Sequence, residues 1–232
     1  MKLGIIDSGV DVGFLREHGI HLAGGARFTL DLGARVLETR SYDREELEAW
    51  RAGTSTVDLQ DENGHGTAVL SILHDQVRPW PEVELYVARI FDQEVRAHSL
   101  CLVEALRWML DEVGVDLLNL SLGTTYRALE APMREVLERA VARGAIIACA
   151  AGGVPTLPAQ LDSVVSVGDP ALMEGLGTGV KVDHVVPHRQ VKLYMGGRWC
   201  GDAPMTTSFA CAVAVAGVLR DGCPPEWRRK QR

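Results

Sequence analysis

The sequence predicts an α/β fold with a mostly parallel central sheet that is covered by helices on both faces. Two observations indicate this class. Short apolar runs typical of buried strands alternate with segments of helical apolar spacing. Gly, Pro, Asp and Asn punctuate the junctions between them. No internal repeat, low-complexity segment or evident linker divides the chain, so residues 1–232 are expected to form a single domain.

The individual elements follow from these patterns. Strands are expected within residues 2–10, 83–91, 115–123, 145–153 and 163–170, with shorter strands or edges at 180–186 and 191–197. Helices are expected within residues 43–50, 66–75, 99–113, 131–144 and 208–222. The rest of segment 13–55 is mixed and polar, and Gly24, Gly25 and Gly33 are interpreted there as breakers of regular structure.

Charge and composition exclude several classes of function. A net charge of −7 argues against general nucleic-acid binding, and the basic tail WRRKQR is interpreted as a solvated end. No apolar run is long enough for a membrane span, and no secretory signal precedes the first strand, so a cytoplasmic protein is expected. The five cysteines are widely spaced and form no Cys-x-x-Cys pair, so neither a zinc site nor a disulfide framework is indicated. No cofactor or metal is expected.

Asp7 ends the first predicted strand and is followed by Ser8 and Gly9. In an open parallel sheet the carboxyl ends of the strands carry the chemistry, so this carboxylate is well placed to reach a cleft. Asp-Ser-Gly is also common turn chemistry, and a turn or helix cap is the alternative interpretation.

His65 opens a predicted helix between Gly64 and Gly66. The two glycines are interpreted as clearance that leaves the ring uncrowded and lets a substrate backbone approach. A helix N-terminus disfavours a protonated ring, which would keep the imidazole available as a base. A partly buried structural histidine is the alternative.

Ser208 begins a helix of small residues. It is either an N-cap or a nucleophile whose own backbone N–H helps to hold an oxyanion. A serine needs a base to remove its proton, and the base needs a third group to fix its tautomer. Asp7, His65 and Ser208 follow one another in the chain order of the subtilisin triad.

The blocks that contain these residues, IIDSGVD, NGHGTAVLSIL and TSFACA, resemble the catalytic blocks of the subtilisin-like serine proteases, or subtilases. The intervening segments VELYVARIFD, LLNLSLG and AIIACAAGG resemble the same family, so the likeness covers nearly the whole chain. It implies a subtilisin-like three-layer fold, trimmed at both ends. It also implies that Asp7 orients the base, that His65 is the base and later the acid, and that Ser208 attacks a peptide carbonyl.

The resemblance extends to substrate-binding positions. An extended peptide is expected to pair with the strand residues Leu120, Ser121, Leu122 and Gly123, although these residues also fit a simple buried strand. Ala151 and Gly152 belong to the expected oxyanion-loop region. The loop after Gly153 is short and helps to line the specificity pocket in relatives, so a more open pocket is expected.

Two positions depart from the family pattern. Gly153 stands where relatives carry an asparagine that donates to the oxyanion, and losing such a donor costs about 10²–10³ in turnover. Thr206, Thr207 and the amide of Asn119 are the candidates to replace it. Thr206 also stands where the family usually has glycine, which could crowd the approach to Ser208.

The trimmed frame leads to three further expectations. Neither the calcium loop nor the pro-region of secreted relatives is expected. A protein partner that stabilises the trimmed core is a hypothesis.

Two functions remain open: a serine endopeptidase that matures a specific peptide or protein substrate, or a weak or inactive subtilase-like protein that binds peptides as a scaffold. Neither nucleic acid nor membrane is an expected partner.

Overall fold

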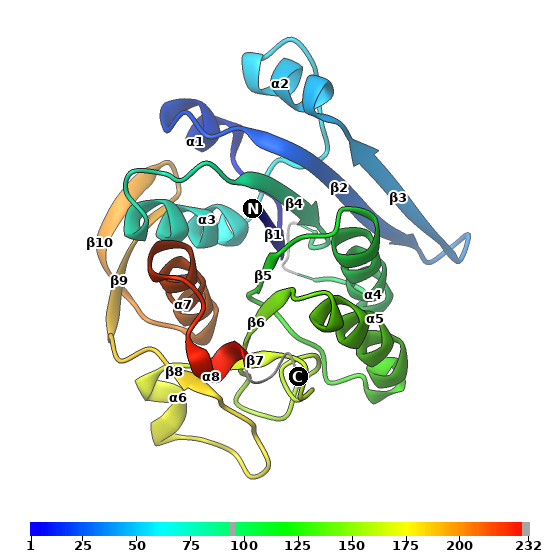
Figure 1. Cartoon of the computed structure of the whole chain (residues 1–232). Coiled ribbons are helices and arrows are strands. Elements are labelled where there is room, and N and C mark those ends of the chain that lie inside the picture. The colour runs from blue at the N-terminus through cyan, green and yellow to red at the C-terminus, as the bar shows by residue number, and fades with distance from the viewer. Residues whose placement is uncertain (93–95, 229–232) are drawn as a thin grey trace.

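The computed structural model describes residues 1–92 and 96–228, so the last four residues of the basic tail lie outside the described part. Its centre is an eight-stranded sheet in which β1 and β5 lie in the middle (Figure 1). The strand order is β3 (Val36–Tyr42), β2 (Leu22–Asp31), β4 (Glu84–Arg89), β1 (Lys2–Asp7), β5 (Leu117–Leu120), β6 (Ile146–Ala150), β7 (Val165–Gly168) and β8 (His184–Val185).

Strands β2 and β3 pair in an antiparallel hairpin, and all other neighbours in this sheet are parallel. The parallel strands are buried almost throughout, because helices cover both faces. This confirms the predicted α/β fold with a mostly parallel central sheet.

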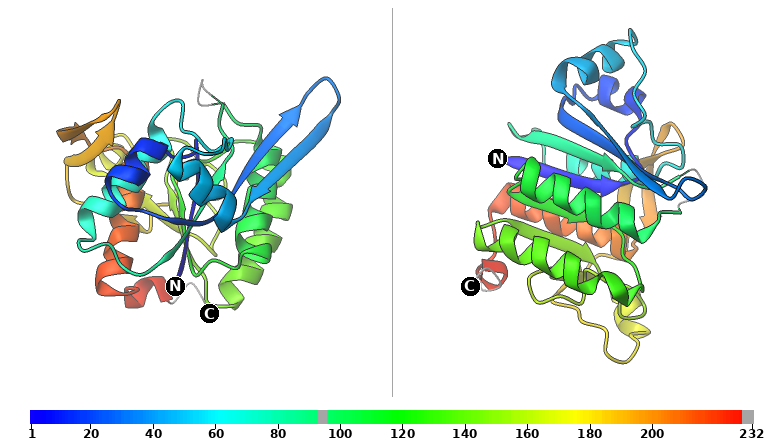
Figure 2. Two further views of the ribbon diagram at one scale, coloured as in Figure 1. Left: turned by 90° about the horizontal axis from the view of Figure 1, so that it is seen from above. Right: turned by 90° about the vertical axis from the view of Figure 1, so that its right-hand side faces the viewer.

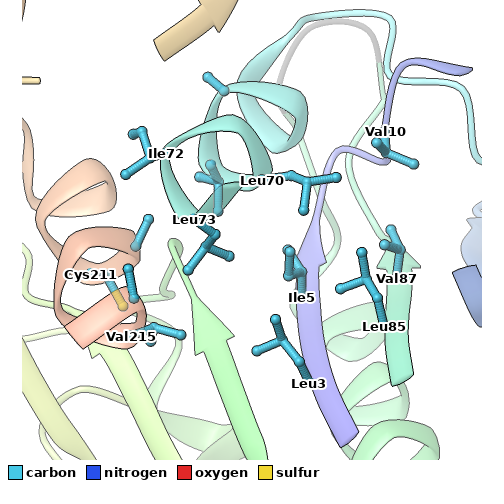
Figure 3. Packing of buried hydrophobic residues seen from close by; sticks show 14 of the residues in the cluster. Leu3, Ile5, Val10, Leu70, Ile72, Leu73, Leu85, Val87, Cys211 and Val215 are labelled. Atoms are coloured by element: carbon cyan, nitrogen blue, oxygen red, sulfur yellow. The ribbon is translucent and has the colours of Figure 1, made fainter. Parts of the chain in front are cut away.

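Helices α3 (His65–Gln76) and α7 (Thr207–Asp221) cover one face of the sheet (Figure 1). Their contact buries Leu70, Leu73, Cys211 and Val215 against the same core as Leu3 of β1 (Figure 3). Alanines make up much of the buried side of α7, and such small side chains let two helices approach closely.

Helices α4 (Ser99–Arg107) and α5 (Glu130–Ala142) cover the other face, and a π-helical turn, Trp108–Glu112, continues α4. Ile6 belongs to the core on this side, whereas its neighbour Ile5 belongs to the core beneath α3, as the two-residue repeat of a strand requires.

Smaller elements complete the chain. The antiparallel hairpin β9 (Gln190–Met195) and β10 (Arg198–Pro204) packs against α3 and leads directly into α7. The remaining helices are α1 (Val12–Glu17), α2 (Arg44–Ala52), the 3₁₀ turn η2 (Arg127–Leu129), α6 (Pro170–Glu174) and α8 (Pro225–Arg228). Within the described residues, no helix combines the length and the apolar character that a membrane crossing needs.

The prediction for segment 13–55 was wrong in part, because Gly24 and Gly25 lie inside β2 instead of breaking it. A Cβ on Gly25 would lie 2.3 Å from Leu59 Cδ1, and one on Gly24 would lie 2.9 Å from the Tyr86 ring. Close packing of the neighbouring Leu59 and Tyr86 side chains therefore favours glycine here. The hairpin that β2 forms with β3 extends well beyond the helical layers (Figure 2).

Candidate active site

Asp7 and His65 meet at the carboxyl end of β1. Asp7 is the last residue of the strand and is fully buried, and His65 is the first residue of α3. The His65 Nδ1 atom lies 2.7 Å from Asp7 Oδ1, and the His65 side chain is 24 % exposed. The carboxylate therefore fixes the ring through Nδ1 and leaves Nε2 as the nitrogen that can take up a proton.

A second buried carboxylate, Asp61, holds the start of α3. Its two oxygens accept five hydrogen bonds, from the Ser8 hydroxyl, the Asn63 and Gly64 amides, and the amide and hydroxyl of Thr67. Asp61 carries no sequence signal beyond the Asp-x-x-Gly turn that precedes His65, and it was not among the predicted site residues.

Ser8 connects the two carboxylates. Its hydroxyl oxygen lies 2.9 Å from Asp61 Oδ1 and 3.2 Å from Asp7 Oδ1, and it accepts a hydrogen bond of 2.8 Å from the Gly66 amide. The hydroxyl has one proton to share between the two acceptors. The end of β1 and the start of α3 are thus joined by charge-assisted hydrogen bonds on both sides of His65.

The electrostatics of His65 differ from the expectation. Burial lowers the pKa of the imidazole, but the carboxylate of Asp7, through its charge and its hydrogen bond, and the charge of Asp61 outweigh burial, so the pKa is raised above its ordinary value. The expected effect of the helix N-terminus is therefore overcome by two nearby negative charges. His65 holds a proton more firmly than a free histidine does.

The glycines around His65 also have a different explanation from the predicted clearance for a substrate. A Cβ on Gly66 would lie 2.2 Å from the Gly9 carbonyl oxygen, so Gly66 is required for α3 to pack against the end of β1. Gly64 has φ +89°, a left-handed conformation that favours glycine. Both glycines are required by the backbone that places His65.

Ser208 lies at the start of α7, next in the chain to Phe209, which contacts His65. Thr206 is the N-cap of this helix, and the Phe209 ring stacks on the His65 ring at a centroid distance of 6.0 Å. The Ser208 hydroxyl donates to the Ser121 carbonyl at 2.9 Å. Among the hydrogen bonds of the described residues, none joins Ser208 to His65.

Asn119 and Ser121 hold Ser208 from within the sheet. The Asn119 side-chain amide donates to the Ser121 hydroxyl at 2.9 Å, and this hydroxyl donates to the Ser208 carbonyl at 2.8 Å. Asn119 is fully buried. Its amide is therefore turned to the interior, away from any surface that a substrate oxyanion could reach, and we withdraw it as an oxyanion donor.

Gly153 lies on the exposed loop after β6. A Cβ built on it would meet no atom within 4 Å, so the position is open to solvent and offers no side-chain donor. Thr207, the first residue of α7, is half-buried, and the Thr206 hydroxyl oxygen accepts from the Phe209 amide. The Ser208 N–H lies in the first turn of α7, where amide groups have no partner within the helix.

The predicted substrate-binding residues differ in their access to solvent. Leu120 is fully buried between β1 and β6, so its backbone serves the sheet and cannot pair with a substrate. Ser121 is buried, Leu122 is half-buried and Gly123 is exposed. On the facing segment, the Ala151 amide donates to Val167 and Gly152 is half-buried.

The cysteines offer no alternative nucleophile. Burial raises the pKa of Cys149 to about 12, which keeps its thiol protonated and inert at neutral pH. Cys200 lies in β10 and packs partly against the core. Within residues 1–92 and 96–228, no three His, Cys, Asp or Glu side chains are grouped so that they could hold a metal ion.

A buried carboxylate bonded to an imidazole, with a serine at the start of the neighbouring helix, is the set of groups that a serine peptidase requires. Comparisons with known proteins agree with this class. The model of the Subtilase family (Peptidase_S8) matches residues 1–178. The chain belongs to the subtilase family.

The matched region contains Asp7 and His65 and ends before Ser208. Among solved structures, the chain is similar to a cold adapted subtilisin-like serine proteinase, at 18 % identity and a TM-score of 0.61, over 93 % of this chain and 72 % of that chain. At this identity the likeness shows the fold, which is subtilisin-like. A search of curated protein sequences found no match.

Proposed function

We propose that the protein is a serine endopeptidase in which Ser208 attacks a peptide carbonyl, His65 takes the proton and Asp7 orients the ring. The observation that carries this proposal is the 2.7 Å contact between Asp7 Oδ1 and His65 Nδ1, beside the start of α7. This contact fixes the tautomer that a general base needs and stabilises the imidazolium formed during attack.

The first step in this mechanism is a rotation of Ser208 about its Cα–Cβ bond. The hydroxyl gives up its hydrogen bond to the Ser121 carbonyl and donates to His65 Nε2. Exchanging one neutral hydrogen bond for another costs little, because each contributes only about 0.5–1.5 kcal/mol. His65 then accepts the proton as Oγ attacks, and returns it to the leaving amine.

The tetrahedral oxyanion is stabilised in this proposal by the Ser208 backbone N–H, since Gly153 supplies no side-chain donor. Thr207 remains a second candidate donor at the start of α7. The enzyme is therefore expected to be slower than a subtilase with a complete oxyanion hole, by about 10²–10³ in turnover.

We further propose that the substrate is a specific peptide or protein that the enzyme matures in the cytosol. Support for a reducing compartment comes from the cysteines, all five of which are free thiols. A protein partner that stabilises the chain belongs to the same proposal. Purification of a monomer that is stable without any other protein would count against such a partner.

The second candidate is a subtilase-like protein that binds peptides with little or no catalysis. The hydrogen bond of the Ser208 hydroxyl to Ser121 and the missing donor at Gly153 favour it. The two candidates differ in the reactivity of one hydroxyl group.

Labelling with a fluorophosphonate probe separates them. Mapping by mass spectrometry is expected to find the label on Ser208, and His65→Ala is expected to abolish it. Ser208→Ala serves as the control for the position of the label. Absence of label under conditions that modify a known subtilase would favour the binding function.

A further inference from the structure

Two chain segments, 121–123 and 151–153, follow the paired strands β5 and β6, and the first of them contacts Ser208. The loop that follows Gly153 turns back toward the first segment. Thr124 N donates to Leu157 O at 2.8 Å, and Leu157 N donates to Thr124 O at 2.7 Å. The two segments are therefore joined by a pair of backbone hydrogen bonds just beyond Gly123.

The side chain of Thr156 lies close to both segments. A Cβ on Gly152 would lie 2.9 Å from Thr156 Cγ2, and a Cβ on Gly123 would lie 3.1 Å from both Cβ and Oγ1 of Thr156. Thr156 therefore lies near both segments and would crowd a side chain on either glycine, as would the Val154 carbonyl oxygen at Gly152 and the Leu157 carbonyl oxygen at Gly123. Its position is fixed by its neighbour Leu157, which is fully buried.

Ser208 contacts the segment 121–123 twice, through its hydroxyl to the Ser121 carbonyl and through its own carbonyl to the Ser121 hydroxyl. A carbonyl attacked by Ser208 must come within about 3–3.5 Å of Oγ.

We propose that the side chain of the residue whose carbonyl is attacked enters between the two segments, and that Thr156 restricts this residue to Gly, Ala or Ser. This inference rests on the proposed function and specifies its substrate class. It also replaces the sequence-based expectation of a more open pocket, because the short loop brings Thr156 into the space between the segments. A larger side chain would have to displace a residue that the bridge between Thr124 and Leu157 holds in place.

Peptides that differ only at this residue test the proposal. The wild-type protein is expected to show a kcat/KM for Ala at least about tenfold higher than for Leu or Phe, because single methylene groups in a tight pocket change selectivity by about 10–200-fold. Thr156→Gly is expected to reduce this ratio by tenfold or more. Thr156→Val keeps the volume and removes the hydroxyl, so the ratio should persist.

Equal cleavage after Ala and Phe in the wild type, or an unchanged ratio in Thr156→Gly, would overturn the proposal. The proposed function would fail if no peptide were cleaved and Ser208 were not labelled. A binding experiment tests the role of Thr156 even in that case. In Ser208→Ala, a peptide ending in Ala should bind more tightly than its counterpart ending in Phe. Equal binding, stronger binding of the Phe peptide, or no binding of either would overturn the proposal.

Discussion

The His65 side and the Gly153 side of the candidate active site contrast in how their polar groups are held. On the His65 side, Asp7, Ser8 and Asp61 join the end of β1 to the start of α3 through short hydrogen bonds. On the other side, Gly153 lies on an exposed loop with no atom near its missing side chain, and the Ser208 hydroxyl is bonded to Ser121.

This contrast indicates which of the candidate catalytic groups are already oriented before substrate binds. The base is oriented before substrate arrives, and its pKa is set by two fixed carboxylates. In the proposed mechanism the nucleophile has to rotate, and Gly153 supplies no side-chain donor to the oxyanion. Turnover should therefore be limited on the Gly153 side.

Asp7→Asn should have the largest effect, a fall in kcat of about 10⁴-fold. The amide presents a donor or a neutral acceptor to His65 Nδ1, so the ring loses both its tautomer and the charge that stabilises the imidazolium. Steady-state hydrolysis of a peptide substrate measures the loss. A decrease of less than tenfold would show that the contact between Asp7 and His65 contributes little to catalysis.

Gly153→Asn should raise kcat by about 10²–10³-fold, equal to about 2.7–4 kcal/mol of transition-state stabilisation. The side chain has room, because a Cβ at this position meets no atom within 4 Å. Gly153→Ala is the matched control and should leave kcat within a fewfold of wild type. If both variants behave alike, the missing donor is not what limits turnover.

Gly66→Ala should lower the free energy of unfolding by about 1–3 kcal/mol, since the new methyl group meets the Gly9 carbonyl at 2.2 Å. Gly217→Ala in α7 is the control, because its Cβ would meet no atom within 4 Å. That change should leave stability unchanged or raise it by up to about 1 kcal/mol. Denaturant unfolding distinguishes the two, and equal effects would contradict the packing argument.

Asp61→Asn should have the smallest of the four effects, a shift in the pH dependence of kcat/KM. The neutral form of His65 is the base, so kcat/KM rises with pH through the pKa of this ring, above the ordinary value of about 6.5. Removing the Asp61 charge lowers that pKa and shifts the rise to lower pH. Glu138→Gln, on the exposed surface of α5, should not shift it. A shift in the opposite direction would contradict the electrostatic role of Asp61.

Much of the fold could be predicted from sequence, because apolar runs such as residues 2–7 and 146–150 have the pattern of buried strands. Strand β2 could not, since Gly24 and Gly25 look like breakers until the side chains of Tyr86 and Leu59 are seen against them. In such a strand tertiary packing overrides local propensity.

The candidate site was predictable to a similar extent. Short motifs identify Asp7, His65 and Ser208, because these residues stand in sequences with recognisable neighbours. The direction of the Ser208 hydroxyl and the place of Thr156 depend on backbone that comes from distant parts of the chain. No local pattern encodes such contacts.

The central claim is that Asp7 and His65 act as one unit with Ser208. It is tested most directly by the energetic coupling between Asp7 and His65 in catalysis. Activities of Asp7→Asn, His65→Ala and the double variant are compared in one peptide assay. Residues that act together give strongly non-additive losses. The double variant should therefore be no less active than His65→Ala alone. A further loss of about 10⁴-fold in the double variant, equal to the effect of Asp7→Asn by itself, would contradict the account.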